Sequence, residues 1–304
     1  MTAVLTDSPY ESDTKGITFL ELEITGKCNL ACAHCYAESG PRGNHGSMSY
    51  EDWLRVIDQA GPCGVEAIQF IGGEPTEHPR FAELMTHALG TGLDVEVYSN
   101  LVNVTPQLWD LYSHPSMFLA TSYYSDIPEE HDSITRRKGS HAATLGNIRE
   151  AVARGITIRA AVIRQLPNQR AEQAAEQLLA LGVIHVNVDR MRSIGRGESK
   201  SNGGIRSVSE LCGRCARNNL AISPDGDVWG CTLSRFLPSP GNVKVQDLAS
   251  ILDGPALAHL REAIPGRTPR RGCSPDDGCS PDDSAPSVCG PDVKHAPGQK
   301  VLSA

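Results

Sequence analysis

The stretch Cys28-Asn-Leu-Ala-Cys32-Ala-His-Cys35 places three cysteines within eight residues, between an alternating apolar and polar run and the first long helical pattern. Thiolates are soft ligands, so this grouping in a reducing compartment indicates zinc or an iron–sulfur cluster rather than disulfides. A closed zinc site or a fully ligated 4Fe–4S cluster needs four protein ligands. The next cysteine is Cys63, so three thiolates at this spacing leave one metal position open for chemistry.

The composition narrows the classes of protein. A chain of 304 residues can bury a sizeable core and favours one large domain plus an appendage. The net charge of −8 argues against general nucleic-acid binding and mildly favours a cationic substrate. No apolar run approaches the ~18–20 residues that span a bilayer, and the first residues lack the basic and apolar blocks of a signal peptide. We therefore expect a cytoplasmic protein with reduced cysteines and with neither nucleic-acid nor membrane partners.

Strand-like and helix-like patterns alternate from residue 17 to about residue 190. Expected strands cover residues 17–25, 65–71, 94–98, 117–122, 156–163 and 183–188. Expected helices begin at the capping-box-like Ser49-Tyr-Glu-Asp52 and cover residues 81–89, 107–112, 143–154 and 171–181, with a polar loop over residues 125–140. This alternation implies βαβ units and a parallel sheet.

The motif Gly72-Gly73-Glu74-Pro75 ends the second expected strand. Ligand sites in parallel α/β folds collect at the carboxyl ends of strands. Glycines let the backbone approach a ligand closely, and an acceptor at this edge can bind an ammonium group. Taken alone, the motif is better interpreted as a tight turn before a helix.

Together the two motifs resemble the radical S-adenosylmethionine (SAM) superfamily, whose signature is C-x3-C-x-Φ-C with Φ usually aromatic; here His34 occupies the Φ position. The resemblance covers about residues 17–190 and implies an α/β fold, a partial (β/α)6 TIM-like barrel. It also implies that Cys28, Cys32 and Cys35 hold a 4Fe–4S cluster whose fourth iron is chelated by the amino and carboxylate groups of SAM. Reductive cleavage of SAM then yields a 5′-deoxyadenosyl radical that abstracts a hydrogen atom from the substrate. A structural zinc knuckle is the alternative.

The resemblance further implies contacts to SAM. In this family the Φ residue lies near the adenine, the GGEP element binds the methionine amino group, and a polar residue ending the fourth strand touches the ribose or carboxylate. Each candidate has an ordinary alternative as a packed aromatic, a turn, or a strand-end or surface residue. The candidates are His34, Tyr36, Gly72, Gly73, Glu74, Ser122 and Arg159. Asp189, Arg190, Arg192 and Arg196 are expected at the same mouth, where they bind substrate or form salt bridges.

A second group of cysteines lies in the last third of the chain, at Cys212, Cys215, Cys231, Cys273, Cys279 and Cys289. Pro224-Asp225-Gly226 predicts a β-hairpin that brings Cys231 back towards Cys215. The spacing Cys215-x10-Gly226-x4-Cys231 resembles the opening of the SPASM and twitch extensions, which carry auxiliary 4Fe–4S clusters. The later Cys-x-Pro-Asp repeats depart from a full SPASM pattern, so we expect one auxiliary cluster, with zinc or a redox-active tail as alternatives.

These patterns divide the chain into four parts. We expect an N-terminal extension over residues 1–16, the barrel over 17–190, a Gly-, Ser- and Arg-rich linker over 191–210, and an auxiliary cluster domain over 211–304. The last part begins with the hairpin and a helix over 247–263, interrupted at Gly254-Pro255, and ends in a Pro-, Asp- and Cys-rich tail.

The resemblance implies a radical SAM oxidoreductase or epimerase. The first hypothesis is maturation of a ribosomally synthesised peptide by crosslinking, thioether formation or epimerisation. The second is dehydrogenation or epimerisation of an amino sugar, aminocyclitol or related small molecule. A zinc-stabilised, non-enzymatic binding protein is the third. With 27 residues before Cys28, we expect no winged leader-binding domain. A reducing partner such as flavodoxin or ferredoxin is also expected.

Overall fold

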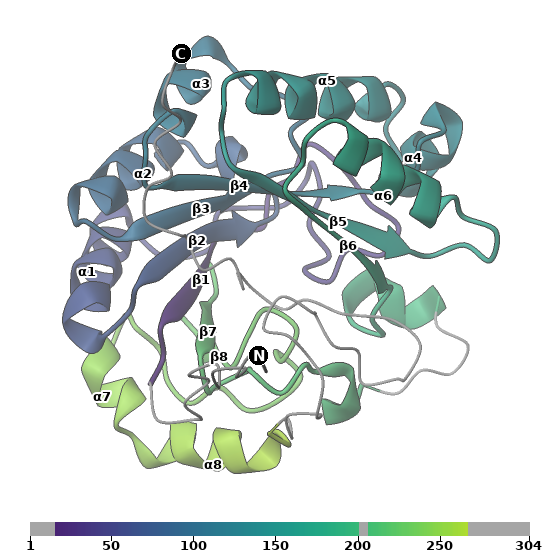
Figure 1. The fold of residues 1–304 in the computed structure, drawn as a ribbon. Helices are drawn as coiled ribbons and strands as arrows, with labels where there is room; N and C mark the ends of the chain where they lie inside the picture. The colour runs from purple at the N-terminus through teal and green to yellow at the C-terminus, as the bar shows by residue number, and fades with distance from the viewer. Residues whose placement is uncertain (1–15, 201–205, 267–304) are drawn as a thin grey trace, which may run out of the picture.

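The computed structural model describes residues 16–200 and 206–266, and its centre is one curved, eight-stranded sheet (Figure 1). The strand order is β6-β5-β4-β3-β2-β1-β7-β8, with every neighbouring pair parallel except β7 and β8. The strands are β1 (Phe19–Thr25), β2 (Ala67–Gly72), β3 (Asp94–Tyr98), β4 (Met117–Tyr123), β5 (Ile158–Arg164), β6 (His185–Arg190), β7 (Asn219–Ile222) and β8 (Val228–Trp229).

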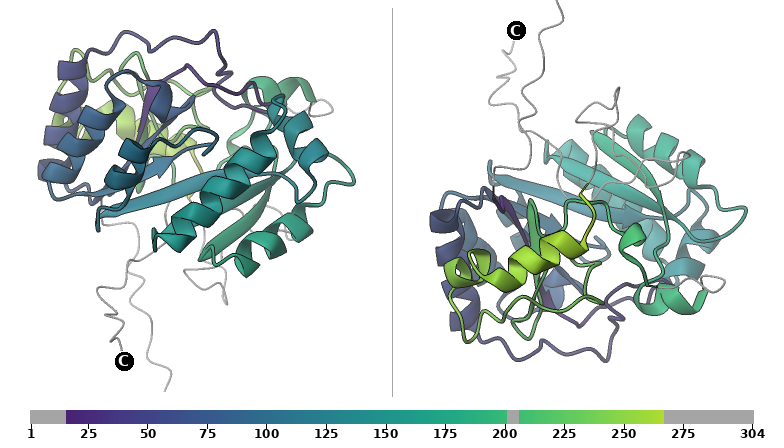
Figure 2. Two further views of the ribbon diagram at one scale, coloured as in Figure 1. Left: turned by 90° about the horizontal axis from the view of Figure 1, so that it is seen from above. Right: turned by 90° about the horizontal axis from the view of Figure 1, so that it is seen from below.

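Helices cover the outer, convex face of this sheet, as the two turned views show (Figure 2). Ser49 caps the start of helix α1: its side chain accepts from the Asp52 amide, and the Asp52 carboxylate accepts from the Ser49 amide. This reciprocal capping box is the one that the sequence predicts. The α-helices are α1 (Tyr50–Ala60), α2 (Phe81–Gly90), α3 (Pro106–Tyr112), α4 (Pro128–Thr135), α5 (Ser140–Ala153), α6 (Ala171–Ala180), α7 (Leu248–Leu252) and α8 (Pro255–Ala263). Short 3-10 helices lie at Gly61–Cys63, Pro75–Glu77, Gly195–Lys200 and Val208–Glu210.

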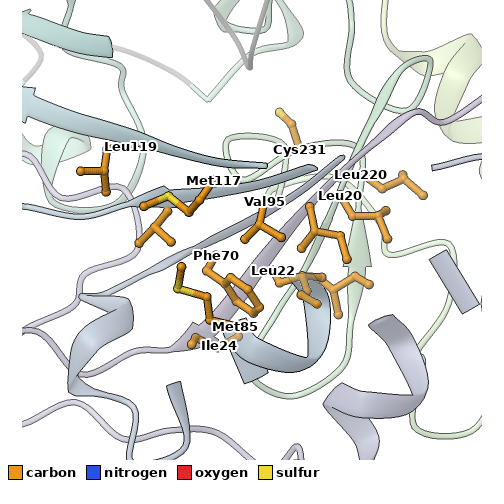
Figure 3. Close-up of a cluster of buried hydrophobic side chains, with 14 of the residues drawn as sticks. Leu20, Leu22, Ile24, Phe70, Met85, Val95, Met117, Leu119, Leu220 and Cys231 are labelled. Carbon is orange, nitrogen blue, oxygen red and sulfur yellow. The ribbon is translucent and has the colours of Figure 1, made fainter. Parts of the chain in front are cut away.

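The main core lies between the sheet and these helices. Alternate residues of β1, Leu20, Leu22 and Ile24, point into it with side chains from β2, β3, β4 and α2 (Figure 3). All three are fully buried. Because side chains alternate along a strand, Glu21 and Glu23 point to the opposite, concave face. The concave face is therefore a polar lumen, and the apolar core stays outside it.

The C-terminal part continues the sheet of the barrel. Strand β7 pairs in parallel with β1 over Phe19–Leu22, and β8 turns back antiparallel to β7. The hairpin turn docks on the loop before α1, because the amides of Ser47 and Met48 both donate to the Pro224 carbonyl at 3.0 Å. No helix in the two described ranges is long and apolar enough to cross a bilayer.

The predicted alternation of strands and helices is confirmed, with end shifts of a few residues. The predicted polar loop over 125–140 is wrong in part, because α4 occupies Pro128–Thr135. Proline at the first helical position and acidic Glu129 and Glu130 in the first turn favour this helix despite its polar sequence. The helix predicted over 247–263 is two helices, with Pro255 starting the second. Cys273, Cys279 and Cys289 lie outside the described residues.

Candidate active site

The first three cysteines lie in the loop that follows β1. Cys28 is buried, and Cys32 and Cys35 are half-buried. The Cys28 amide donates to the Gly40 carbonyl at 3.1 Å, and the Cys35 amide donates to the Cys32 carbonyl at 3.4 Å. One compact loop therefore presents three free thiols at the carboxyl edge of the sheet, where parallel α/β folds bind ligands.

The loop is held from its outer side by α4 and the turn after it. The Ala33 amide donates to the Ile134 carbonyl at 2.9 Å, and the Ala31 amide donates to the Thr135 carbonyl at 3.3 Å. Nη1 of Arg137 donates to the Asn29 carbonyl at 3.2 Å. Part of the stretch predicted as a polar loop over residues 125–140 is thus hydrogen-bonded to the cysteine loop.

The segment after β6 holds the loop from the other side. Nε of Arg196 donates to the Cys32 carbonyl at 2.8 Å, and its Nη2 donates to the Ser39 carbonyl at 2.7 Å. The Arg196 amide donates to the Cys35 carbonyl at 3.0 Å. Part of the predicted linker is therefore packed on the cysteine loop.

The two glycines after β2 allow close packing of the protein chain on itself. A Cβ on Gly73 would lie 2.1 Å from the Lys27 carbonyl oxygen, and one on Gly72 would lie 2.5 Å from the Thr25 carbonyl oxygen. Gly72 also has φ +123°, a backbone conformation that side chains rarely permit. These positions need glycine because β2 ends against the start of the cysteine loop.

Glu74 is buried and ties together the ends of β2 and β3. Its Oε1 accepts from the Ser99 and Thr76 hydroxyls at 2.8 Å each, and its Oε2 accepts from the Asn100 amide at 2.8 Å. Burial raises the pKa of Glu74, and these hydrogen bonds oppose that rise. Both carboxylate oxygens are thus engaged by the chain itself, and a contact to the methionine amino group stays a prediction.

Asn100 is a site residue that the sequence analysis missed. Its Nδ2 donates to Oδ1 of Asn29 at 2.7 Å and lies 3.8 Å from the Cys28 sulfur. The next residue, Leu101, is buried with φ +54°, an uncommon backbone conformation for a side chain of this size. The signal was present in the sequence, since Ser99-Asn100 directly follows an expected strand.

The other predicted SAM contacts lie at different levels of the barrel. The His34 ring meets the Tyr124 ring edge-on at 5.2 Å, beside the cysteine loop. The Ser122 hydroxyl lies 3.1 Å from the Tyr98 hydroxyl on the lumen side of β4. Arg159 lies near the start of β5 and forms a two-pronged ion pair with Glu96, with both contacts at 2.7 Å. Arg159 therefore belongs to the buried polar side chains of the concave face that are described next, and its contact with SAM stays a prediction.

The lumen floor is a row of buried polar side chains at one level of the sheet. Glu21 of β1 is in register with Gln69 of β2, which is in register with Glu96 of β3. The Gln69 amide donates to Glu96, which also binds Arg159. Burial raises the pKa of Glu21 to about 8, so this carboxyl is largely protonated at neutral pH. The sequence analysis missed this row because an alternating strand was not recognised as facing a lumen.

The second group of thiols lies in the core. Cys212, Cys215 and Cys231 are 6%, 0% and 3% exposed. The Cys215 and Cys231 sulfurs are 2.7 Å apart, which is longer than a disulfide bond. Contacts with the other two thiols and burial raise the pKa of Cys215. The predicted hairpin therefore brings these three thiols together, as a shared cluster requires.

A bridge cluster, defined as Glu23, Tyr36, Trp229 and Arg235, connects the two thiol groups. Nη2 of Arg235 donates to both carboxylate oxygens of Glu23, which is 1% exposed. The Arg235 guanidinium lies 5.5 Å from the Tyr36 ring centre and 5.2 Å from the Trp229 ring centre. Tyr36 follows Cys35 and Trp229 lies two residues before Cys231, so this cluster spans the interval between the cysteine groups.

The donor chemistry fits iron–sulfur clusters. Burial raises the pKa of Cys28 and raises that of Cys32 to about 12, so a positive centre is needed to keep these sulfurs as thiolates. Within residues 16–200 and 206–266, no three His, Cys, Asp or Glu side chains close around a point suited to one metal ion. Both groups offer thiol donors, which are the ligands that iron–sulfur clusters use.

Comparison with known proteins identifies the family. A model described as the radical SAM superfamily matches residues 22–189, more than half of the chain. The chain belongs to the radical SAM superfamily. A model described as an iron–sulfur cluster-binding domain, SPASM, matches residues 212–280. The family resemblance, the fold class and the cofactors, a 4Fe–4S cluster with SAM and further iron–sulfur ligation, are thereby confirmed.

Relatives of this radical SAM protein include proteins of peptide biosynthesis. It is 27% identical to the antilisterial bacteriocin subtilosin biosynthesis protein AlbA of Bacillus subtilis, over 79% of this chain and 60% of AlbA. It is 30% identical to the mycofactocin maturase MftC of Mycobacterium tuberculosis, over 59% of this chain and 46% of MftC. The chain thus spans about half the length of the curated relatives it matches.

Solved structures share the fold. Streptococcus suis SuiB bound to the precursor peptide SuiA superimposes with a TM-score of 0.67 at 13% identity, over 81% of this chain and 67% of SuiB. The protein anSMEcpe with bound SAM gives 0.61 at 13% identity, over 82% of each chain. At this identity the likeness supports the architecture, a radical SAM barrel with a C-terminal extension.

Proposed function

We propose that this radical SAM enzyme matures a ribosomally synthesised peptide. The names of its relatives support a peptide substrate, since AlbA is a bacteriocin biosynthesis protein, MftC a maturase, and SuiB has been solved with a precursor peptide. The observation that carries the proposal is that the bridge cluster lies between a thiol group at the barrel mouth, two of whose three thiols are half-buried, and a fully buried thiol group in the C-terminal part. The free thiols suit a reducing compartment, so we place the enzyme in the cytoplasm.

Cys28, Cys32 and Cys35 would hold the SAM-binding cluster, and Cys212, Cys215 and Cys231 would hold an auxiliary one, with further ligands among Cys273, Cys279 and Cys289. When bound, the first cluster with SAM supplies the 5′-deoxyadenosyl radical, and the second supplies a one-electron acceptor. Around SAM, His34 and Tyr36 would pack on the adenine, Ser122 would contact the ribose or carboxylate, and Gly72, Gly73 and Glu74 would shape the amino-group site.

The residues of this chain orient the substrate and exclude water. Arg235 keeps its charge balanced by Glu23, so the lumen wall stays neutral at this point. The Arg235 guanidinium lies over the rings of Tyr36 and Trp229, and this stack would orient a peptide side chain in the lumen. Loss of one hydrogen atom and then one electron and one proton from that side chain is a net oxidation, which suits an oxidoreductase type better than an epimerase.

A small polar substrate is the second candidate, and the lumen floor favours it. Glu21, Gln69 and Glu96 offer hydrogen-bonding groups at one buried level, which suits the hydroxyl and amino groups of an amino sugar or aminocyclitol.

The test is to reconstitute the enzyme without oxygen and follow deuterium. Peptides encoded by short reading frames beside the gene, and separately amino sugars, would be supplied fully deuterated with SAM and dithionite. A peptide substrate predicts deuterium in 5′-deoxyadenosine and a peptide mass lowered by an oxidation, with no product from Cys28→Ser. Deuterium arriving from an amino sugar and from no peptide would reject peptide maturation.

A further inference from the structure

The turn between α4 and α5 carries a basic ridge, defined as Arg136, Arg137 and Lys138. Arg136 and Lys138 are exposed, and Arg137 is half-buried. The whole chain has a net charge of −8, so three successive cations on one exposed turn are not an average piece of its surface. Neither Arg136 nor Lys138 forms an ion pair with a residue in the part of the chain that the structure describes.

The basic ridge lies directly behind the cysteine loop. Ile134 and Thr135, the residues before it, accept the backbone hydrogen bonds of Ala33 and Ala31. Arg137, within it, donates to the carbonyl next to Cys28. Helix α4 lies at the end of the sheet towards which β5 and β6 point (Figure 1). Arg136 and Lys138 are therefore direct neighbours in sequence of residues that form hydrogen bonds with the cysteine loop.

The ridge is also held in a fixed shape. Arg136 ends α4 with φ +57°, a left-handed conformation for which glycine is the usual residue. The Asp132 carboxylate accepts from the Gly139 amide at 2.6 Å, the Ser140 hydroxyl at 2.9 Å and the His141 amide at 2.8 Å. This acid is engaged on the α5 side of the turn, and the Glu130 carboxylate accepts from the Arg170 amide at 3.2 Å.

We propose that the basic ridge is the docking surface for an acidic one-electron carrier protein. The inference rests on the proposed function, in which the cysteine loop holds a cluster that must be reduced. In that function SAM and substrate would occupy the lumen side of that loop, which leaves the outer side for entry of the electron. One electron leaves the carrier, which is oxidised by one unit, and enters the cluster, which is reduced by one unit. Opposite charge speeds such encounters and orients the partners.

The test compares a protein donor with a small one. Reconstituted wild type and the Arg136→Glu/Lys138→Glu variant would be mixed anaerobically with an acidic flavodoxin in its hydroquinone form, and separately with dithionite, while cluster bleaching is followed by stopped flow. We expect the flavodoxin rate to fall about 10- to 100-fold at low salt and the wild-type advantage to shrink as salt rises. The dithionite rate should stay the same.

Two further variants make the result specific. Arg149→Glu/Arg154→Glu changes the charge equally at the far end of α5, where both side chains are exposed, and should leave the flavodoxin rate within about threefold. Arg136→Gly removes one charge while favouring the same backbone shape, so a smaller drop there cannot come from misfolding.

Three outcomes would overturn the docking site. These are an unchanged flavodoxin rate in the ridge variant, an equal loss in the far-end control, or a raised KM for the precursor peptide under dithionite with an unchanged flavodoxin rate. The last would assign the ridge to the peptide. If dithionite-reduced wild type instead cleaves no SAM, the proposed function fails with the ridge hypothesis.

Discussion

The two thiol groups of this protein are built in opposite ways. Cys28, Cys32 and Cys35 lie on a loop at the barrel mouth, which Arg137 and Arg196 hold through main-chain carbonyls. Cys212, Cys215 and Cys231 belong to the hydrophobic core and have almost no exposure; Cys231 is labelled in Figure 3. A centre that must admit SAM needs an open position, whereas a centre that only exchanges electrons can be sealed. We therefore expect the half-buried Cys32 and Cys35 to mark the reactive centre, and the buried Cys212, Cys215 and Cys231 to mark a centre that only exchanges electrons.

The largest expected effect comes from removing each group in turn. Cys28/Cys32/Cys35→Ala should lower iron from about eight to about four per chain and reduce 5′-deoxyadenosine formation more than about a thousandfold. Its apo thermal stability should change little, because two of the three side chains are half-exposed. Cys212/Cys215/Cys231→Ala should instead lower apo stability by about 2–4 kcal/mol in urea titrations, since it opens space in the core. Similar stability losses in both variants would contradict the comparison.

The next largest effect is expected from removing the ion pair between Glu23 and Arg235, which lies between the two thiol groups. Glu23→Gln leaves the Arg235 guanidinium beside a neutral group in a buried site, which should cost about 3–5 kcal/mol of unfolding free energy. Glu23→Gln/Arg235→Gln should recover part of that loss, because neither side chain is then charged. Chemical denaturation of the four proteins measures the coupling, and strictly additive losses would show that the ion pair does not join the regions.

Two arginines that each hold main-chain carbonyls, one in each region, provide a matched test. Arg196 holds the cysteine loop, and Arg217 holds the end of α8 by donating to the Arg261 and Ile264 carbonyls at 3.0 and 3.1 Å. Arg196→Ala should weaken SAM binding by about 10- to 100-fold, since two charge-assisted hydrogen bonds are worth roughly 3 kcal/mol together. Arg217→Ala should lower stability without changing SAM affinity. Equilibrium dialysis measures both, and equal affinities would reject the role of Arg196.

The smallest expected effect is a pH dependence of folding stability that arises from His131 in α4, the helix that packs on the cysteine loop. Burial, with the nearby His141, lowers the pKa of His131 from 6.5 to about 4. The unfolded chain therefore binds a proton that the folded chain refuses between these pH values, and folding stability should fall as pH drops from 6.5 to 4.

His131→Phe keeps the ring contacts to Tyr123 and Tyr124 and should reduce that fall by at most about 3 kcal/mol. The exposed His259→Gln is the matched control and should leave the pH profile unchanged. An unaltered profile in His131→Phe would remove His131 as its source.

Features that depend on neighbours in sequence could be predicted from the sequence, whereas features that depend on long-range contacts could not. The cysteine spacing, Gly72-Gly73-Glu74 and the strand alternation led to the family and fold, because each depends on neighbours in sequence. Glu21 and Glu23 were missed because alternation marks a polar face without saying whether it meets solvent or a lumen. Arg196 and Arg235 act on partners 164 and 212 residues away, a relation that no local pattern contains. The pairing of β7 with β1 is equally non-local.

The most direct test of the division between the two thiol groups is electron paramagnetic resonance of each reduced variant with and without SAM. In Cys212/Cys215/Cys231→Ala, the remaining cluster signal should change when SAM is added, because the half-exposed loop leaves one iron position open. In Cys28/Cys32/Cys35→Ala, the signal should not respond to SAM. A SAM-dependent change in the second variant, or none in the first, would show that the two thiol groups do not divide these roles.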